Sequence, residues 1–322
     1  MITTSVRNIT RIGCLAAVVL ALVGLIVQGP APASTAPRPT PQATAAEPGT
    51  AESPPLPGAP DAATVAQHVE DRTRARMRRV SAGARVSVSV RDEASDSTFD
   101  FGSGRFATAS LVKVHLVAVM LWRAEEAGVA LTPAQRTDVE QMLIRSENDP
   151  ATRAYAALGG ATGVERGLEQ AFGSSRIQVG EQFRWGHSMT RPRAVVALLD
   201  EILDTDRDTP YELMQDAMSR VIPEQRWGVS ALADEGSTVQ TKVGWVQDPD
   251  GWVVNSSGRV LVDDEPVTIS VMTDRNATLD GGIATVEKVA RLVGDVVRTR
   301  RAAQQKELPF SSSPRRSAVQ VG

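Results

Sequence analysis

A serine and a lysine stand one helical turn apart in "TASLVKVHLVAVML" (108–121), a stretch that is otherwise mostly apolar. Residues at i and i+3 share one helix face, with Cβ atoms about 5 to 6 Å apart, so the amine of Lys113 can reach the hydroxyl of Ser110. The apolar residues that follow would desolvate this amine and lower its pKa. The pair predicts a serine nucleophile with a lysine as general base. A helix cap followed by a surface lysine is the alternative interpretation.

Lysine is scarce in this chain, since only four of its 35 basic residues are lysines. Arginine therefore serves wherever a positive charge is enough. A position that keeps lysine indicates a need for an amine that can lose its proton near neutral pH. We give Lys113 such a role and assign none to Lys288 and Lys306.

Two later segments carry residues of the same chemical kind. The segment "RSENDPATRAYAALGG" (145–160) places Ser146 and Asn148 at the predicted start of a helix, and "QTKVGWV" (240–246) places Lys242 and Gly244 on a predicted strand. Taken singly, these residues are also explained by a helix cap and by a cross-strand ion pair.

In order, the motifs Ser-x-x-Lys, Ser-x-Asn and Lys-x-Gly resemble those of the penicillin-recognising serine enzymes, and their surroundings are most similar to class A β-lactamases. "RFATASLVKV" (105–114), the Gly-Gly pair after Ser-x-Asn and "TRPRAVVALLDEIL" (190–203) extend the resemblance, which covers about residues 62 to 305. It implies an α+β fold. An antiparallel sheet of about five strands from both chain ends is flanked by terminal helices, and an all-α lobe is inserted between them.

The resemblance also implies roles for individual residues. Ser110 would be the nucleophile and Lys113 its proton acceptor. Ser146 would relay a proton to the leaving nitrogen, and Lys242 would supply the field that positions Ser146 and a substrate carboxylate.

Substrate-binding roles follow from the same resemblance. Asn148 would hold the substrate amide. The third motif contributes Gly244 and Trp245, and the backbone N–H groups of Ser110 and Trp245 would form the oxyanion hole.

Several positions depart from the family pattern. Val243 stands where the family has a threonine or serine, which removes a hydroxyl that would bind the substrate carboxylate, and Trp245 replaces a small residue. The interval from Ser110 to Ser146 is about two dozen residues shorter than in the family, so we expect one wall of the cleft to be missing.

The deacylating base is the fourth family element. In "VGEQFRWGHSMTRP" (179–192), Glu181 lies at nearly the right distance, but the usual Leu-Asn is absent, and an exposed loop carboxylate is the alternative. His187 is a second base candidate on this loop, or a histidine that packs beside Trp185. We expect His115 to lie on another face of its helix than Lys113.

The elements that must position these residues follow from hydrophobic periodicity. It predicts helices over 62–80, 110–126, 133–145, 148–158, 161–172, 191–204 and 282–301, with Thr190 capping the sixth. It predicts strands over 84–92, 97–103, 237–247, 251–264 and 265–274.

The N-terminus has the pattern of an export signal. Arg7 and Arg11 precede an apolar run from Ile12 to Val27, so we interpret 1–33 as a signal peptide or membrane anchor and 34–60 as a Pro/Ala-rich linker. Residues 61–305 form the predicted hydrolase domain and 306–322 a disordered tail. The chain is then secreted, or anchored to the outer face of the cytoplasmic membrane.

Composition excludes several function classes. A net charge of −3 and no basic block argue against nucleic acid. The only cysteine, Cys14, lies in the apolar run, and no cluster has metal-ligand spacing, so we expect no metal and no cofactor. We predict a monomeric active-serine hydrolase that acts on small β-lactams or related cell-wall amides. A D-alanyl peptidase or esterase and a catalytically idle cell-wall binding protein remain the alternatives.

Overall fold

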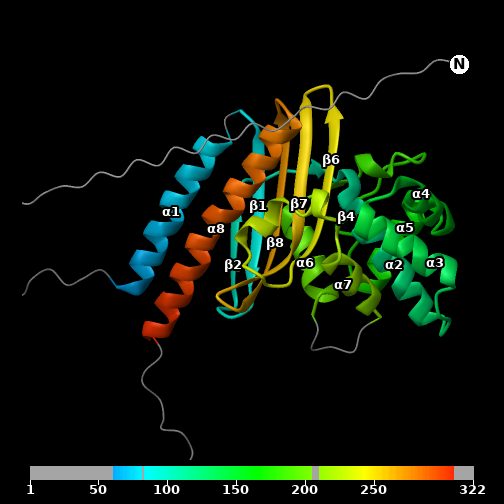
Figure 1. Cartoon of the computed structure of the whole chain (residues 1–322), viewed down its shortest axis with the longest axis horizontal. Coiled ribbons are helices and arrows are strands. Elements are labelled where there is room, and N and C mark those ends of the chain that lie inside the picture. Colours follow the sequence, from blue (N-terminus) through cyan, green and yellow to red (C-terminus); the bar gives the residue numbers. More distant parts are fainter. Residues whose placement is uncertain (1–60, 82, 205–209, 308–322) are drawn as a thin grey trace, which may run out of the picture. The chain divides into compact units, whose positions relative to one another are not determined.

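Five antiparallel strands form the main sheet, in the order β2-β1-β8-β7-β6 (Figure 1). A computed structural model describes residues 61–81, 83–204 and 210–307. The strands are β1 (Arg85–Asp92), β2 (Ser97–Phe101), β6 (Gln240–Asp248), β7 (Gly251–Val262) and β8 (Glu265–Asn276). The sheet therefore joins strands from both ends of the domain, which confirms the predicted α+β fold. The predicted signal or anchor, the linker and residues 308–322 lie outside the described residues.

Helices cover both faces of this sheet. The terminal helices α1 (Ala62–Val80) and α8 (Leu279–Glu307) lie side by side over one face (Figure 1), and α8 packs valines such as Val289 and Val293 against Ile269 of β8. On the other face, α6 (Pro192–Ile202) packs against β1 and β8. Because both faces are covered, the central strands bury nearly all their side chains.

The helical lobe lies between the two parts of the sheet in sequence. It contains α2 (Val112–Glu126), α3 (Pro133–Glu140), α4 (Asn148–Ala157), α5 (Gly160–Phe172) and α7 (Glu212–Ser219). Every side chain of α2 from Val112 to Val119 is fully buried. A helix that is buried on all sides forms the centre of its lobe, so α2 offers a rigid support for whatever precedes it.

Short elements connect the lobe to the sheet. The strands β3 (Phe106–Ala107), β4 (Ile177–Gln178) and β5 (Met189–Thr190) form a small sheet in the order β3-β5-β4. Single helical turns are the 3-10 segments η1 (Ala109–Leu111), η3 (Trp185–His187), η4 (Pro223–Gln225) and η5 (Gly228–Leu232), and the π-helical turn η2 (Gln141–Arg145).

Several predicted boundaries differ from the structure, and four of the differences have local reasons. Ser110 does not open an α-helix: the Leu111 N–H donates to the Thr108 carbonyl three residues back, so Ser110 lies in a 3-10 turn and α2 begins at Val112. Thr190 is not the cap of α6, because it lies in β5 and donates its hydroxyl to the Arg176 carbonyl.

The other two errors concern the second motif and the C-terminus. Ser146 does not lie at the start of a helix. It ends the π-helical turn η2 in a left-handed backbone conformation, with φ 62°. The helix α4 starts at Asn148 with Glu147 at its N-cap. The last helix runs from Leu279 through Glu307, so it includes the first two residues of the predicted tail. The helix α7 was not predicted at all.

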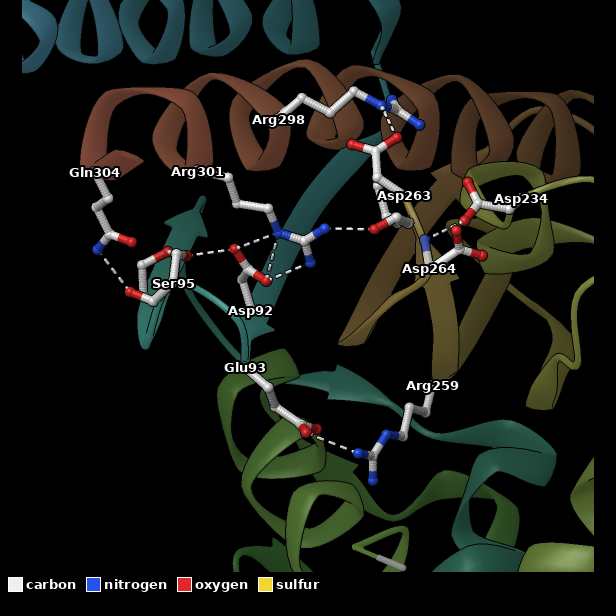
Figure 2. Close-up of polar contacts among 12 residues, drawn as sticks. Asp92, Glu93, Ser95, Asp234, Arg259, Asp263, Asp264, Arg298, Arg301 and Gln304 are labelled. Carbon is white, nitrogen blue, oxygen red and sulfur yellow. Dashed lines mark hydrogen bonds and ion pairs between the residues drawn. The ribbon is translucent and has the colours of Figure 1, made fainter. Parts of the chain in front are cut away.

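Polar contacts fix the end of α8 to two turns of the sheet (Figure 2). The Arg301 guanidinium donates to both carboxylate oxygens of Asp92, at 2.6 Å for the shortest contact, and Asp92 also accepts from Ser95. Asp92 is only 2% exposed at its side chain. Arg259 of β7 binds Glu93 at 2.7 Å. Because the Asp92 carboxylate is buried, loss of its arginine would leave an unpaired charge inside the protein.

Among the helices of residues 61–81, 83–204 and 210–307, none combines the length and hydropathy that a membrane span requires.

Candidate active site

Ser110 lies in the turn η1 between β3 and α2, with strained backbone directly before it. Ala109 has φ 47°, a left-handed value that costs energy for a residue with a Cβ atom. Asn255 of β7 holds this turn to the sheet: its amide donates to the carbonyls of Ala107 and Thr108, at 2.8 and 3.2 Å, and accepts from the Thr273 N–H. The nucleophile candidate is therefore fixed between two rigid elements.

Lys113 is fully buried and surrounded by acceptors. Its Nζ atom donates to Ser110 Oγ at 2.8 Å, to the Ser146 carbonyl at 2.7 Å and to Asn148 Oδ1 at 2.8 Å. The ring of Trp185 lies under the same nitrogen, with its centroid 5.0 Å away. Burial lowers the pKa of Lys113 to about 7, because the ammonium form loses its hydration. The amine can thus be neutral near physiological pH while it stays in contact with the serine.

Ser146 links the two buried lysines. Its hydroxyl accepts from Lys242 Nζ at 2.9 Å and lies 3.4 Å from Lys113 Nζ. Lys242 is also fully buried, and it donates a second hydrogen bond to the Val243 carbonyl at 2.9 Å. Burial and the neighbouring Lys113 lower the pKa of Lys242 well below its usual value. The arrangement Lys113, Ser146, Lys242 can carry a proton away from Ser110 along hydrogen bonds that already exist.

The backbone of Gly244 packs directly against the backbone of the Ser110 turn. A Cβ atom at Gly244 would lie 2.7 Å from the Leu111 nitrogen and 2.9 Å from the Ser110 nitrogen. No side chain fits there, which explains the glycine and leaves the Ser110 amide uncovered next to β6. The strand β6 is the last in the sheet order, so within the described ranges the edge that faces Ser110 has no strand partner. An uncovered amide beside a free strand edge is the geometry that an oxyanion hole requires.

The neighbours of Gly244 on β6 point to the opposite face from Lys242. Val243 is fully buried. Trp245 packs on Trp227, with ring centroids 5.9 Å apart, and both tryptophans are partly exposed.

The remaining base candidates lie apart from this cluster. Glu181 follows Gly180, whose carbonyl accepts from the Tyr155 hydroxyl, but its own side chain is exposed and makes no hydrogen bond to a described residue. His187 lies 3.9 Å from Asp248 and not among the partners of Lys113. His115 is fully buried, and neither of its ring nitrogens has a hydrogen-bond partner in the described chain.

In the described ranges, no three metal-ligating side chains come together.

Solved structures of class A β-lactamases share this arrangement of elements. A β-lactamase from Xanthomonas campestris aligns with a TM-score of 0.62 and 17% identity, over 71% of this chain and 98% of that one. A class A β-lactamase from Mycobacterium abscessus aligns with a TM-score of 0.59 and 19% identity, over 69% and 97%. One from Bacteroides cellulosilyticus aligns with a TM-score of 0.61 and 15% identity, over 71% and 97%. The chain has the class A β-lactamase fold.

At these identities the likeness shows the β-lactamase fold alone, so the chemistry rests on the side chains described above. A scan against protein-family models found no match, and neither did a search of curated proteins.

Within the β-lactamase fold, sequence reasoning missed two residues that position the site. Asn255 anchors the Ser110 turn, and Trp185 lies under the Lys113 amine. An asparagine inside a valine-rich strand is a signal that could have been read, because a buried amide needs partners. Trp185 gave no comparable signal.

Proposed function

We propose that this chain is an active-serine hydrolase that forms an acyl-enzyme on Ser110 with β-lactams or related cell-wall amides. The observation that carries the proposal is the 2.8 Å contact between Ser110 Oγ and the buried Nζ of Lys113. A neutral amine at that distance can accept the hydroxyl proton.

The reaction would proceed in two stages. Lys113 takes the proton of Ser110, and Oγ attacks the substrate carbonyl while the Ser110 and Trp245 amides stabilise the oxyanion. The carbon–nitrogen bond then breaks, and the proton passes through Ser146 to the leaving nitrogen. Water hydrolyses the resulting ester and regenerates Ser110. Asn148 has its Oδ1 bound to Lys113, so its amide NH₂ is the group that remains for the substrate.

Intact-protein mass spectrometry after exposure to a penicillin tests this proposal. We expect the protein to gain the mass of the penicillin, and Ser110→Ala to gain nothing. Lys113→Arg should also lose the adduct, since arginine stays protonated near neutral pH. An unmodified wild-type protein at millimolar β-lactam and D-alanyl ester would favour the idle binding protein instead.

For deacylation we propose Glu181 as the base, because it lies on the loop that brings Trp185 under Lys113. Its carboxylate is exposed and has no hydrogen-bond partner among the described residues, which supports slow turnover. Glu181→Gln should let the acyl-enzyme accumulate while its formation rate changes little. Unchanged release in this variant would exclude Glu181.

We further propose that the enzyme works outside the cytoplasmic membrane. The support is the apolar run from Ile12 to Val27 behind two arginines, together with a substrate class found in the cell wall. Fractionation of cells that express the full chain tests this, and recovery in the cytoplasm would contradict it.

A further inference from the structure

The buried amine of Lys113 has uncharged hydrogen-bond partners. Within the described ranges, its Nζ atom donates to oxygens of Ser110, Ser146 and Asn148, and none of these is a carboxylate. The network continues through Ser146 to a second amine, that of Lys242, which repels a positive charge on Lys113. A buried ammonium normally pairs with an anion. Whenever Lys113 is protonated, its charge must therefore be stabilised in another way.

The other charged side chains on the elements around Lys113 do not supply this anion. At η2, the start of α4 and the loop 179–188 they are all exposed, namely Arg145, Glu147, Asp149, Glu181, Arg184 and His187. On β6, Asp248 lies beside His187 and not beside Lys113. His115 on α2 is buried, and burial lowers its pKa to about 4, so it is neutral near pH 7. Water and salt screen the exposed charges.

One aromatic face is turned to the amine. Lys113 Nζ lies over the ring of Trp185, 5.0 Å from its centroid. This is within the range of about 6 Å in which a cation is attracted to an indole face, and the attraction is strongest where both groups are withdrawn from water. Both side chains are buried. The ring thus places negative electrostatic potential where the ammonium charge lies.

The loop 179–188 fixes this ring from both of its ends. The indole N–H of Trp185 donates to Thr152 Oγ1 of α4 at 3.3 Å. The Trp185 carbonyl accepts from the hydroxyl and the N–H of Ser188, at 2.6 and 3.1 Å, and the same hydroxyl accepts from the Gly180 N–H at 3.0 Å. The Ser188 carbonyl accepts from the Thr108 N–H at 2.8 Å, which joins the loop to the strand end before Ser110. The ring is therefore preorganised with respect to the Ser110 and Lys113 pair.

We propose that the indole face of Trp185 is the electrostatic partner of the Lys113 ammonium, and that it sets the pH at which Lys113 becomes a base for Ser110. The inference rests on the proposed function and adds to it a positioning residue that acts through Lys113. A carboxylate at the same place would keep the amine protonated well above neutral pH. An alkyl group would give the ammonium no stabilisation. The indole lies between these two cases.

Fluorinated tryptophans at position 185 test the proposal without a change of shape, because each fluorine withdraws electron density from the indole face. The full-length protein is made with tryptophan, 5-fluoro-, 5,7-difluoro- and 5,6,7-trifluorotryptophan at this position. The pH profile of Ser110 acylation by benzylpenicillin is then measured for each by intact-protein mass spectrometry. We expect the midpoint to fall stepwise, by about one pH unit over the series. The same series at Trp122 of α2 is the matched control and should leave the midpoint unchanged.

Two substitutions predict shifts of opposite sign. Trp185→Glu should raise the midpoint by at least about one pH unit, because an anion then faces the ammonium. Trp185→Phe should lower it by less than the trifluorinated ring does, since phenylalanine keeps a weaker face. A midpoint that does not rise in Trp185→Glu would contradict the proposal. If that variant does not fold, the fluorinated series still decides.

A direct titration of Lys113 separates this inference from the proposed function. The chain has only four lysines, so lysine labelled with ¹³C at Cε gives few NMR signals, and Lys113→Arg assigns the one that matters. We expect its titration midpoint to fall with each added fluorine at position 185. A midpoint that stays constant over the series, or that moves equally with fluorine at Trp122, overturns the role of Trp185. If Lys113 follows the series but no acyl donor modifies Ser110, the proposed function fails while the pairing of Lys113 with Trp185 stands.

Discussion

The rate of acylation should be proportional to the fraction of Lys113 that is deprotonated. Burial lowers the pKa of this amine to about 7, and only the neutral amine can accept the Ser110 proton. Because the base works when it is deprotonated, the rate should rise with pH and level off above the midpoint.

The size of the effect follows from the same pKa. With a pKa of about 7, about half of the amines are neutral at pH 7 and about 1% at pH 5. Acylation at pH 5 should therefore be about fiftyfold slower than at pH 7, and acylation at pH 9 about twofold faster. Lys113→Arg removes the titrating base, and the loss should reach about 10² to 10⁴ in rate.

Single-turnover acylation of Ser110 by an ester, followed by quenching and mass spectrometry, measures this profile. His187→Gln is the matched control, since His187 contacts Asp248 and none of the partners of Lys113, and it should leave the midpoint unchanged. A midpoint near 4, a midpoint that moves in His187→Gln, or undiminished acylation in Lys113→Arg would refute the assignment of Lys113 as base.

Three other perturbations have expected outcomes. Gly244→Ala should slow acylation by about 10² to 10³, because its methyl group covers the Ser110 amide at 2.9 Å and removes an oxyanion donor; an unchanged rate would place the oxyanion elsewhere. Burial lowers the pKa of His115 to about 4. Between pH 6.5 and 4 the histidine is therefore protonated in the unfolded chain but neutral in the folded one. The free energy of unfolding should fall as the pH drops through that range, by about 3 kcal/mol in total. Denaturant titrations of wild type and His115→Phe at pH 7 and 4.5 measure this, and equal losses in both would contradict it. Arg301→Ala leaves the buried Asp92 unpaired and should cost about 3 to 5 kcal/mol of unfolding free energy. The matched Arg298→Ala breaks an exposed pair with Asp263 and should cost less than about 1 kcal/mol, and equal costs would show that burial does not set the difference (Figure 2).

The sequence by itself determined the fold class and the order of the chemical motifs. Alternating apolar residues placed β1, β7 and β8 within a few residues of their bounds, and the apolar run after Lys113 identified the buried helix α2. These features are local, because the spacing of apolar residues within one short stretch of sequence indicates a helix or a strand. The spacing of Ser110 and Lys113 is local in the same sense, since one helical turn brings them together.

Tertiary structure alone decided how the motifs meet. Ser146 is 33 residues from Lys113 and 96 from Lys242, yet its hydroxyl and carbonyl join both amines. It does so from a left-handed backbone after a π-helical turn, which no helical periodicity predicts. Strand register likewise decides two further contacts. Trp227 packs on Trp245, and Asn255 donates hydrogen bonds to the Ser110 turn. Such contacts arise from the packing of distant segments, where burial and the need to satisfy each polar group override local preference.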